Sequence, residues 1–334
     1  DYLLSWFGAS PTIFPYANDY LSWYLAGTVF ALLSTGMCQF IICQGFAKTG
    51  MFSVIIGAAA NIALDPVFIF VLGMGVKGAA IATVISQMAS CAFVLWFLLG
   101  KRPLVPITFG GYRRRVMKQV LVVGLSPFLI IASDSVLIIM MNTIIQRYGG
   151  ELQGDMLLTC NTIVQSFMLM ITMPLGGITG GTQTIMGYNY GAGRPDRIRR
   201  AEKHILLLGI AFTAVMFLIA NLLPQYFVRI FTQDPEYTSI TNWAIRVYTL
   251  CIIPLAIEYT VVDGFTGMGI AKVAVSLSMF RKMVYMIAML VLPAVAGAQN
   301  IFYAEPISDI IASIAASSTY LLLSGKVLKD GRRF

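Results

Sequence analysis

Polar residues along this chain are concentrated in short segments that separate long apolar blocks. Each block has 20 residues or more, and about 20 is the number that an α-helix needs to cross a hydrocarbon core of roughly 30 Å. The blocks contain glycine and proline and show no strict alternation of apolar and polar residues, which favours helices over barrel strands. They cover residues 20–45, 51–73, 78–99, 119–146, 156–184, 205–231, 240–263, 279–298 and 301–325. The pattern predicts an all-α, polytopic membrane protein with nine membrane-spanning helices in this sequence.

The composition agrees with this pattern and excludes a soluble domain. Of the 334 residues, 58% are hydrophobic and 11% are charged, whereas an ordinary soluble domain has about 25% charged residues. The formal net charge of +8 could indicate nucleic-acid binding, but such a site needs a basic face on a soluble domain. We therefore expect no nucleic-acid partner.

Lysine and arginine are concentrated in alternate loops. Nineteen of the 23 basic residues fall in segments that we assign to one side of the membrane. The 19 are Lys48; Lys101, Arg102, Arg113, Arg114, Arg115 and Lys118; Arg194, Arg197, Arg199, Arg200 and Lys203; Lys272, Arg281 and Lys282; and Lys326, Lys329, Arg332 and Arg333. Because loops rich in lysine and arginine face the cytoplasm, we expect the 101–118 loop, the 191–203 loop and the C-terminus to be cytoplasmic.

Cysteine and histidine give no indication of a metal site or of catalysis. The five cysteines fall within predicted spans without metal-ligand spacing, and the single histidine, His204, lies at the start of a span. An intramembrane enzyme would need a nucleophile–base pair or a metal cluster. We expect neither enzymatic activity nor a cofactor other than a coupling ion.

Two pairs of similar segments indicate an internal repeat. "QGFAKTG" at 44–50 resembles "DGFTGMG" at 263–269 with an offset of 219, and a second pair near 76–86 and 299–309 has an offset of 222. Both copies run in the same direction, which is typical of transporters with two similar bundles around a central cleft. A channel would not need such a repeat.

The repeat predicts the organisation of the chain. Residues 1–100 form the second half of an N-lobe, 101–118 a cytoplasmic loop between lobes, 119–326 a C-lobe of six spans, and 327–334 a cytoplasmic tail. The first copy supplies three spans and the second supplies six, so we expect the complete protein to have three more helices before this sequence.

Three motifs carry a resemblance to a known family. They are "NIALDPVFIFVLGMGVKGAAIATVISQ" at 61–87, "QTIMGYNYGAGRPDRIRRA" at 183–201 and "YAEPISD" at 303–309. Together with the glycine motifs of the repeat, they make the chain resemble the bacterial multidrug and toxic compound extrusion family over essentially its whole length.

The resemblance implies a fold and a function. It implies twelve helices in two six-helix lobes, of which this chain matches the fourth to the twelfth. It implies a monomer in the lipid of the bacterial cytoplasmic membrane that exports amphipathic, often cationic compounds in exchange for protons or sodium ions. The alternative is a flippase for lipid-linked sugars. A flippase cavity should be strongly cationic to hold pyrophosphate, and the charges that we assign to the spans are mainly acidic.

Asp65 is the most informative charged residue in the apolar blocks. Asn61 lies one helical turn before it, and Pro66, which follows, should bend the helix. A charged carboxyl in the bilayer is costly, so Asp65 either ties helices together or faces a cavity and exchanges protons. The resemblance matches Asn61, Asp65 and Thr83 to a proton-responsive network in the family's N-lobe.

Four further acids are candidates in the C-lobe. The resemblance implies that Asp134 binds cations or the coupling ion. Glu258, Glu305 and Asp309 are possible substrate-binding or cation-binding residues. Glu305 and Asp309 are four residues apart and would repel each other, so we expect one of the two to hold a proton.

Overall fold

The computed structural model describes residues 14–108 and 110–330, and the described part is helical without strands. Eight of its helices are long and apolar enough to cross a membrane, and a bent pair of helices makes a ninth span. The prediction of an all-α, polytopic membrane protein is therefore confirmed. The chain divides into two compact units, of which the first ends at Tyr112 and the second begins at Arg113.

Unit 1 consists of three long helices. They are α2 (Phe14–Cys43), α3 (Ala47–Pro66) with its continuation η1 (Val67–Val71), and α4 (Gly75–Leu99). Helix α4 packs against both α2 and α3. A Cβ atom at Gly27 of α2 would lie 2.4 Å from Cγ2 of Val84, so the glycine allows α2 and α4 to approach closely. Ser90 of α4 donates a hydrogen bond of 2.8 Å to the backbone oxygen of Ser53 in α3.

Pro66 changes the geometry of α3 as its chemistry requires. A proline cannot donate the backbone hydrogen bond of a regular helix, and the chain continues after Pro66 as the π-helical segment η1. Single π-helical turns inside longer helices are frequent at functional sites. The predicted disturbance of this helix next to Asp65 is therefore present, in the form of a π-helical turn.

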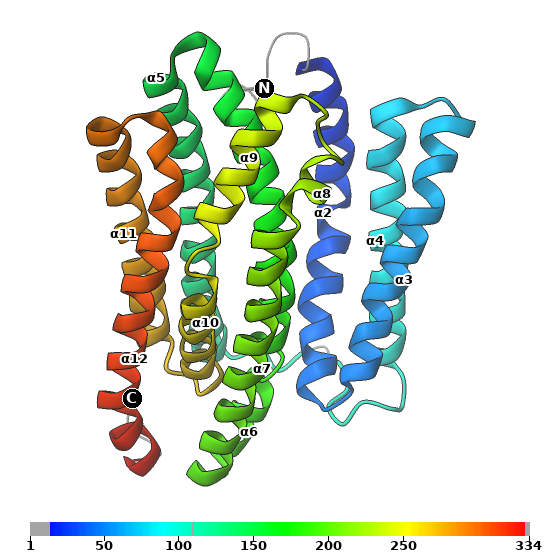
Figure 1. Ribbon diagram of the computed structural model, residues 1–334. Coiled ribbons are helices and arrows are strands. Elements are labelled where there is room, and N and C mark those ends of the chain that lie inside the picture. Colours follow the sequence, from blue (N-terminus) through cyan, green and yellow to red (C-terminus); the bar gives the residue numbers. More distant parts are fainter. Residues whose placement is uncertain (1–13, 109, 331–334) are drawn as a thin grey trace. The chain divides into compact units, whose positions relative to one another are not determined.

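Unit 2 contains the remaining helices. They are α5 (Arg114–Gly180), α6 (Gln183–Gly191), α7 (Pro195–Leu222), α8 (Pro224–Val228), α9 (Pro235–Tyr248), α10 (Ile252–Gly267), α11 (Ala271–Ala296), η2 (Ala298–Tyr303) and α12 (Ala304–Asp330). Helix α5 folds back on itself at Gly150, whose φ of +65° suits glycine (Figure 1). Its two arms supply the predicted spans 119–146 and 156–184. The predicted span 240–263 is broken into α9 and α10, which meet at an angle of 48°.

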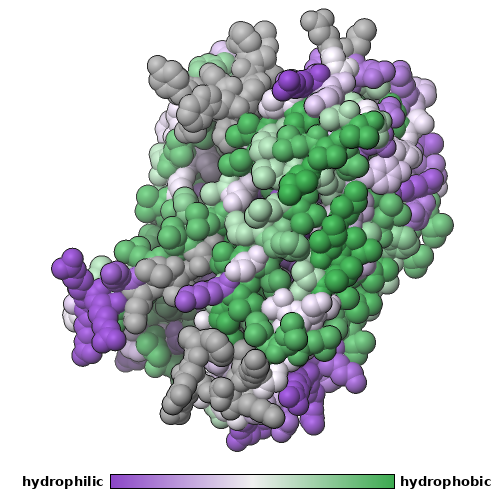
Figure 2. All heavy atoms as spheres, turned by 90° about the vertical axis from the view of Figure 1, so that its left-hand side faces the viewer, coloured by the Kyte–Doolittle hydropathy of each residue, from purple (hydrophilic) through white to green (hydrophobic). Residues whose placement is uncertain are grey.

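Large apolar side chains lie both inside unit 2 and on its surface. Phe167, Phe302 and Met289 are almost fully buried in its main core, whereas Met283, Ile287 and Ile314 are exposed. Figure 2 shows a broad hydrophobic area on the face that includes α11 and α12, with hydrophilic side chains gathered near the helix ends. In water such an area would be unfavourable, and in lipid it is the expected surface.

One predicted boundary is wrong, and the error matters for the site. The span expected at 279–298 begins at Ala271, because α10 ends before Gly269 and α11 begins two residues after it. Gly269 has a φ of +78°, a conformation that glycine adopts at turns. Arg281 and Lys282, which the predicted span placed in its first turn, therefore lie about three turns into α11. Both must be removed from the 19 basic residues assigned to cytoplasmic segments.

Candidate functional site

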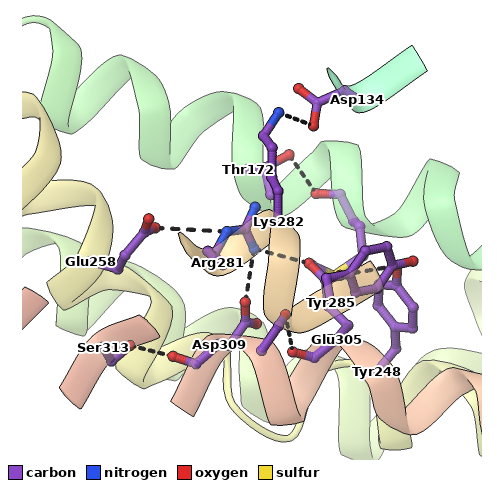
Figure 3. A network of polar contacts seen from close by, with 12 residues as sticks. Asp134, Thr172, Tyr248, Glu258, Arg281, Lys282, Tyr285, Glu305, Asp309 and Ser313 are labelled. Atoms are coloured by element: carbon purple, nitrogen blue, oxygen red, sulfur yellow. Dashed lines mark hydrogen bonds and ion pairs between the residues drawn. The ribbon is translucent and has the colours of Figure 1, made fainter. Parts of the chain in front are cut away.

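Arg281 is the centre of a network of charged groups in unit 2 (Figure 3). Its NH1 atom lies 2.9 Å from Oδ1 of Asp309 and 3.2 Å from Oε1 of Glu305. Its Nε atom lies 4.0 Å from Oε2 of Glu258. The guanidinium group thus joins α11 to α10 and α12, and it brings together three of the acids that the sequence analysis singled out.

The charges around Arg281 do not balance. Three carboxyl groups face one guanidinium, the Asp309 side chain is 0% exposed and the Glu258 side chain is 5% exposed. Burying unpaired negative charge is very costly. One oxygen of Asp309, Oδ2, is buried without a hydrogen-bond partner among the described residues. The network therefore needs a bound proton or another cation to approach neutrality.

The expected repulsion between Glu305 and Asp309 is reduced by Arg281. Both carboxyl groups contact the same NH1 atom, so an opposite charge offsets the repulsion between two like charges. The expected repulsion took no account of Arg281, because this residue was counted with the cytoplasmic basic residues, at the start of the predicted span 279–298.

Neutral side chains extend the network along one direction. The hydroxyl group of Tyr248 lies 3.4 Å from Oε2 of Glu305 and 3.3 Å from the hydroxyl group of Tyr285. Gln165, on the second arm of α5, donates a hydrogen bond of 2.8 Å to Tyr248. These contacts fix the Glu305 side chain against three helices besides its own. None of these three polar residues was among the predicted site residues.

Lys282, the neighbour of Arg281, contacts a different helix. Its ammonium group lies 2.5 Å from Oδ1 of Asp134 and also donates to the backbone oxygen of Ile130. Both acceptors belong to the first arm of α5. The Lys282 side chain is 10% exposed, whereas the Asp134 side chain is 55% exposed. Asp134, predicted to bind a cation, is thus already paired with a cation of the protein itself.

Two cavities meet at these charged residues. The first has a volume of about 370 Å³ and the second about 410 Å³. Both are lined by Asp134, Tyr259, Arg281 and Lys282.

The remaining linings differ in character. The first cavity adds amide, aromatic and sulfur-containing side chains, and the second adds small residues and acids. The first has Asn161, Gln165, Met141, Met168, Tyr248, Tyr285 and Glu305; the second has Gly176, Gly180, Gln183, Glu258 and Asp263, among others. Asn161 is 6% exposed, and its Oδ1 atom accepts no hydrogen bond from the described residues. The first cavity therefore combines apolar and polar side chains in its wall.

The predicted cluster in unit 1 is also brought together. The Nδ2 atom of Asn61 donates to Oδ1 of Asp65 over 3.1 Å and to Oγ1 of Thr83 over 3.4 Å. The Thr83 hydroxyl donates to the backbone oxygen of Ala79 over 2.9 Å. Asn61 and Thr83 were both expected as hydrogen-bond partners of Asp65. Asn61 bonds the carboxyl group directly, whereas Thr83 is linked to Asp65 only through Asn61. All three side chains are half-buried.

One signal in the sequence could have identified Arg281 and Lys282. The segment "GIAKVAVSLSMFRKM" places both residues eleven or more positions after the turn glycine Gly269. A helix that begins directly after such a glycine reaches these residues only after about three turns. Counting from the glycine would have placed both bases inside the span.

Comparison with known proteins places these features in context. The sequence model of the MatE family matches residues 1–67 and 130–292. The multidrug export protein MepA of Staphylococcus aureus (strain MSSA476) is 20% identical to the chain, over 99% of the chain and 72% of MepA. MepA of Staphylococcus haemolyticus is 22% identical over the same shares. A structure described as the outward-facing conformation of a multidrug resistance MATE family transporter has a TM-score of 0.88 at 21% identity, covering 97% of this chain and 72% of that one.

Proposed function

The chain belongs to the MatE family, and on this basis we propose that it is an exporter of amphipathic, often cationic compounds, coupled to the inward flow of protons or sodium ions. Its relatives are named as multidrug export proteins and align with nearly the whole chain. The function that their name describes requires a cavity for small amphipathic molecules and a site whose charge changes when an ion binds.

The cavity at Arg281 and Lys282 is the observation that carries the proposal. Its volume of about 370 Å³ lies within the range of roughly 300–1,000 Å³ that is typical of small-molecule sites. Methionine and tyrosine side chains provide adaptable apolar surface, and charged groups lie beside them. This combination suits ligands with a hydrophobic body and a charged group.

Two places can bind the coupling ion. In unit 2, the three carboxyl groups at Arg281 exceed its charge and favour a proton. In unit 1, Asp65 has the neutral partners Asn61 and Thr83 nearby, which suits a carboxyl that takes up and releases a proton. Coupling at either place would shift the balance between transport states by the difference in ion affinity.

The alternative function is a flippase for lipid-linked sugars. Two basic residues, Arg281 and Lys282, lie inside α11, so acidic charge in the spans is not enough to exclude this function. A pyrophosphate group would need free basic side chains. The two basic residues in the cavity wall are both paired: Arg281 with carboxyl groups of α10 and α12, and Lys282 with Asp134. The cavity therefore favours cationic or mixed-charge compounds over a pyrophosphate.

The proposal includes the environment of the protein. We place it as a monomer in the bacterial cytoplasmic membrane, with its C-terminus in the cytoplasm. The basic residues of the segments 101–118 and 191–203, which lie in the connections between helices and in the first turns of α5 and α7, support this orientation. No cofactor is required beyond the coupling ion.

The test is transport with each gradient imposed separately. The protein expressed from its complete gene is reconstituted in proteoliposomes, and movement of ethidium is followed after a pH gradient or a sodium gradient is imposed. We expect one of the two gradients to drive ethidium against its own gradient, and an ionophore for that ion to stop the movement. Ethidium movement equal to that of protein-free liposomes under both gradients would contradict the proposal.

A further inference from the structure

The pair formed by Lys282 and Asp134 is asymmetric in its exposure. The ammonium group lies on a side chain that is 10% exposed, and the carboxyl group on one that is 55% exposed. The ammonium group lies 2.5 Å from Oδ1 of Asp134, and the carboxyl group is the more exposed member of the pair. An ordinary surface ion pair would have both members in solvent.

The pair lies where a ligand would meet it. Asp134 and Lys282 line both of the cavities described above, so the same carboxyl group is within reach of an occupant of either one. A positively charged ligand has Asp134 as its most accessible carboxyl partner there, because the Glu305 side chain is 13% exposed and already contacts Arg281.

A ligand cation that binds Asp134 shares the single negative charge of that carboxyl group with Lys282. If it takes over the Asp134 carboxyl group, the buried ammonium keeps only the backbone oxygen of Ile130 among its two acceptors. A buried charge that loses its partner is strongly unfavourable. A ligand that also brings an acidic group removes this penalty, because its acid can pair with Lys282 while its cation pairs with Asp134.

We propose that Lys282 competes with the ligand's cationic group for the carboxyl group of Asp134. It thereby sets a preference for zwitterionic over monocationic amphipathic compounds. This inference rests on the proposed function in one respect, since it takes the cavity at Lys282 as the site of the exported compound. Lys282 is then a specificity-determining residue.

The test compares two probes that differ in a single charge. Rhodamine B carries a carboxylate and a delocalised cation at neutral pH, and its ethyl ester carries only the cation. Binding of each dye to the purified protein is measured by fluorescence polarisation in detergent. The measured quantity is the affinity for the ester divided by the affinity for rhodamine B. We expect this ratio to be about tenfold higher for Lys282→Gln than for the unchanged protein.

Two further variants give the inference independent checks. Asp134→Asn removes the partner of the cation and releases Lys282, so the preference should shift in the opposite direction, towards rhodamine B. Lys272→Gln removes the same charge from the exposed first turn of the same helix, and it should leave the preference unchanged. Scanning fluorimetry verifies that each variant is folded, and the Asp134 variant alone is sufficient if Lys282→Gln does not fold.

The outcomes separate the two proposals. An unchanged ratio of affinities in both site variants, or an equal loss for both dyes, would show that Lys282 is only a structural tie and would overturn the inference. Binding of neither dye to the unchanged protein would overturn the inference and also the cavity as the substrate site. A transport assay that fails while the dye preference shifts as expected would contradict only the proposed function.

Discussion

The helix pair α3–α4 of unit 1 and the pair α11–α12 of unit 2 hold polar contacts at corresponding positions of the sequence repeat. Asn61 of α3 contacts Thr83 of α4, and Arg281 of α11 contacts Glu305 of α12. The first residues are 220 positions apart and the second residues 222, close to the offsets of the repeat. The same place in a helix pair is thus occupied by a neutral hydrogen bond in one unit and by an ion pair in the other.

The difference determines which kind of group each carboxyl group contacts. Asp65 has a neutral amide as its hydrogen-bond donor, and no basic side chain of the described residues forms an ion pair with it. Asp309 and Glu305 share a guanidinium group that holds α10, α11 and α12 together. We therefore expect substitutions in unit 1 to change ion coupling with little effect on stability, and substitutions at Arg281 to change stability first.

The largest effect is expected at Arg281. Arg281→Met leaves Asp309 and Glu258 buried without their cation, and removing one partner of a buried ion pair destabilises a protein by about 3–5 kcal/mol. Thermal unfolding in detergent should show a clear decrease in Tm, and the additional change Asp309→Asn should recover part of it. Arg246→Met, at an exposed position of α9, is the matched control with little change in Tm. An unchanged Tm of Arg281→Met would mean that the ion pairs contribute little to stability. The expected difference in stability between substitutions in unit 1 and in unit 2 would then be wrong.

A loss of coupling without a loss of stability is expected at Asp65. Asp65→Asn keeps the size of the side chain and its contact with Asn61, and it imitates a permanently protonated group. Proton-driven ethidium export in proteoliposomes should be abolished. The free energy of unfolding should change by less than about 0.5 kcal/mol, so Tm should stay nearly the same. Asp19→Asn in α2, which is exposed, provides the control. Normal proton-driven export by Asp65→Asn would assign Asp65 a purely structural role.

The smallest effect is expected at Thr83. Thr83→Ala removes the contact with Asn61 but leaves the Asn61–Asp65 hydrogen bond, and one such bond contributes about 1 kcal/mol. Proton-driven export should decrease to roughly a fifth, which is the factor that corresponds to 1 kcal/mol. Thr83→Ser, which retains the hydroxyl group, should recover most of the rate. Equal activity of the alanine and serine variants would show that the Thr83 hydroxyl does not tune Asp65.

The sequence alone determined the fold class and one of the two polar sites. Long apolar blocks can satisfy their backbone groups in lipid only as helices, so the spans follow directly from composition and length. The spacing of Asn61 and Asp65 places both side chains on one helix face, because residues four apart are neighbours on a helix. The hydrogen bond between them depends only on their four-residue spacing within one helix, and this spacing can be read from the sequence.

The charged network of unit 2 was decided by tertiary structure. Arg281 meets partners that lie 23 to 28 positions away in the chain, and Lys282 meets a carboxyl group 148 positions away. No local pattern specifies such contacts, since they depend on the packing of α5, α10 and α12 around α11. Even the burial of both bases depended on where α11 begins. The predicted span placed them in its first turn, and a start eight residues earlier places them about three turns into the helix, in the wall of a cavity. A charge in an apolar segment indicates that a partner is needed, but only the packed helices determine which partner it finds.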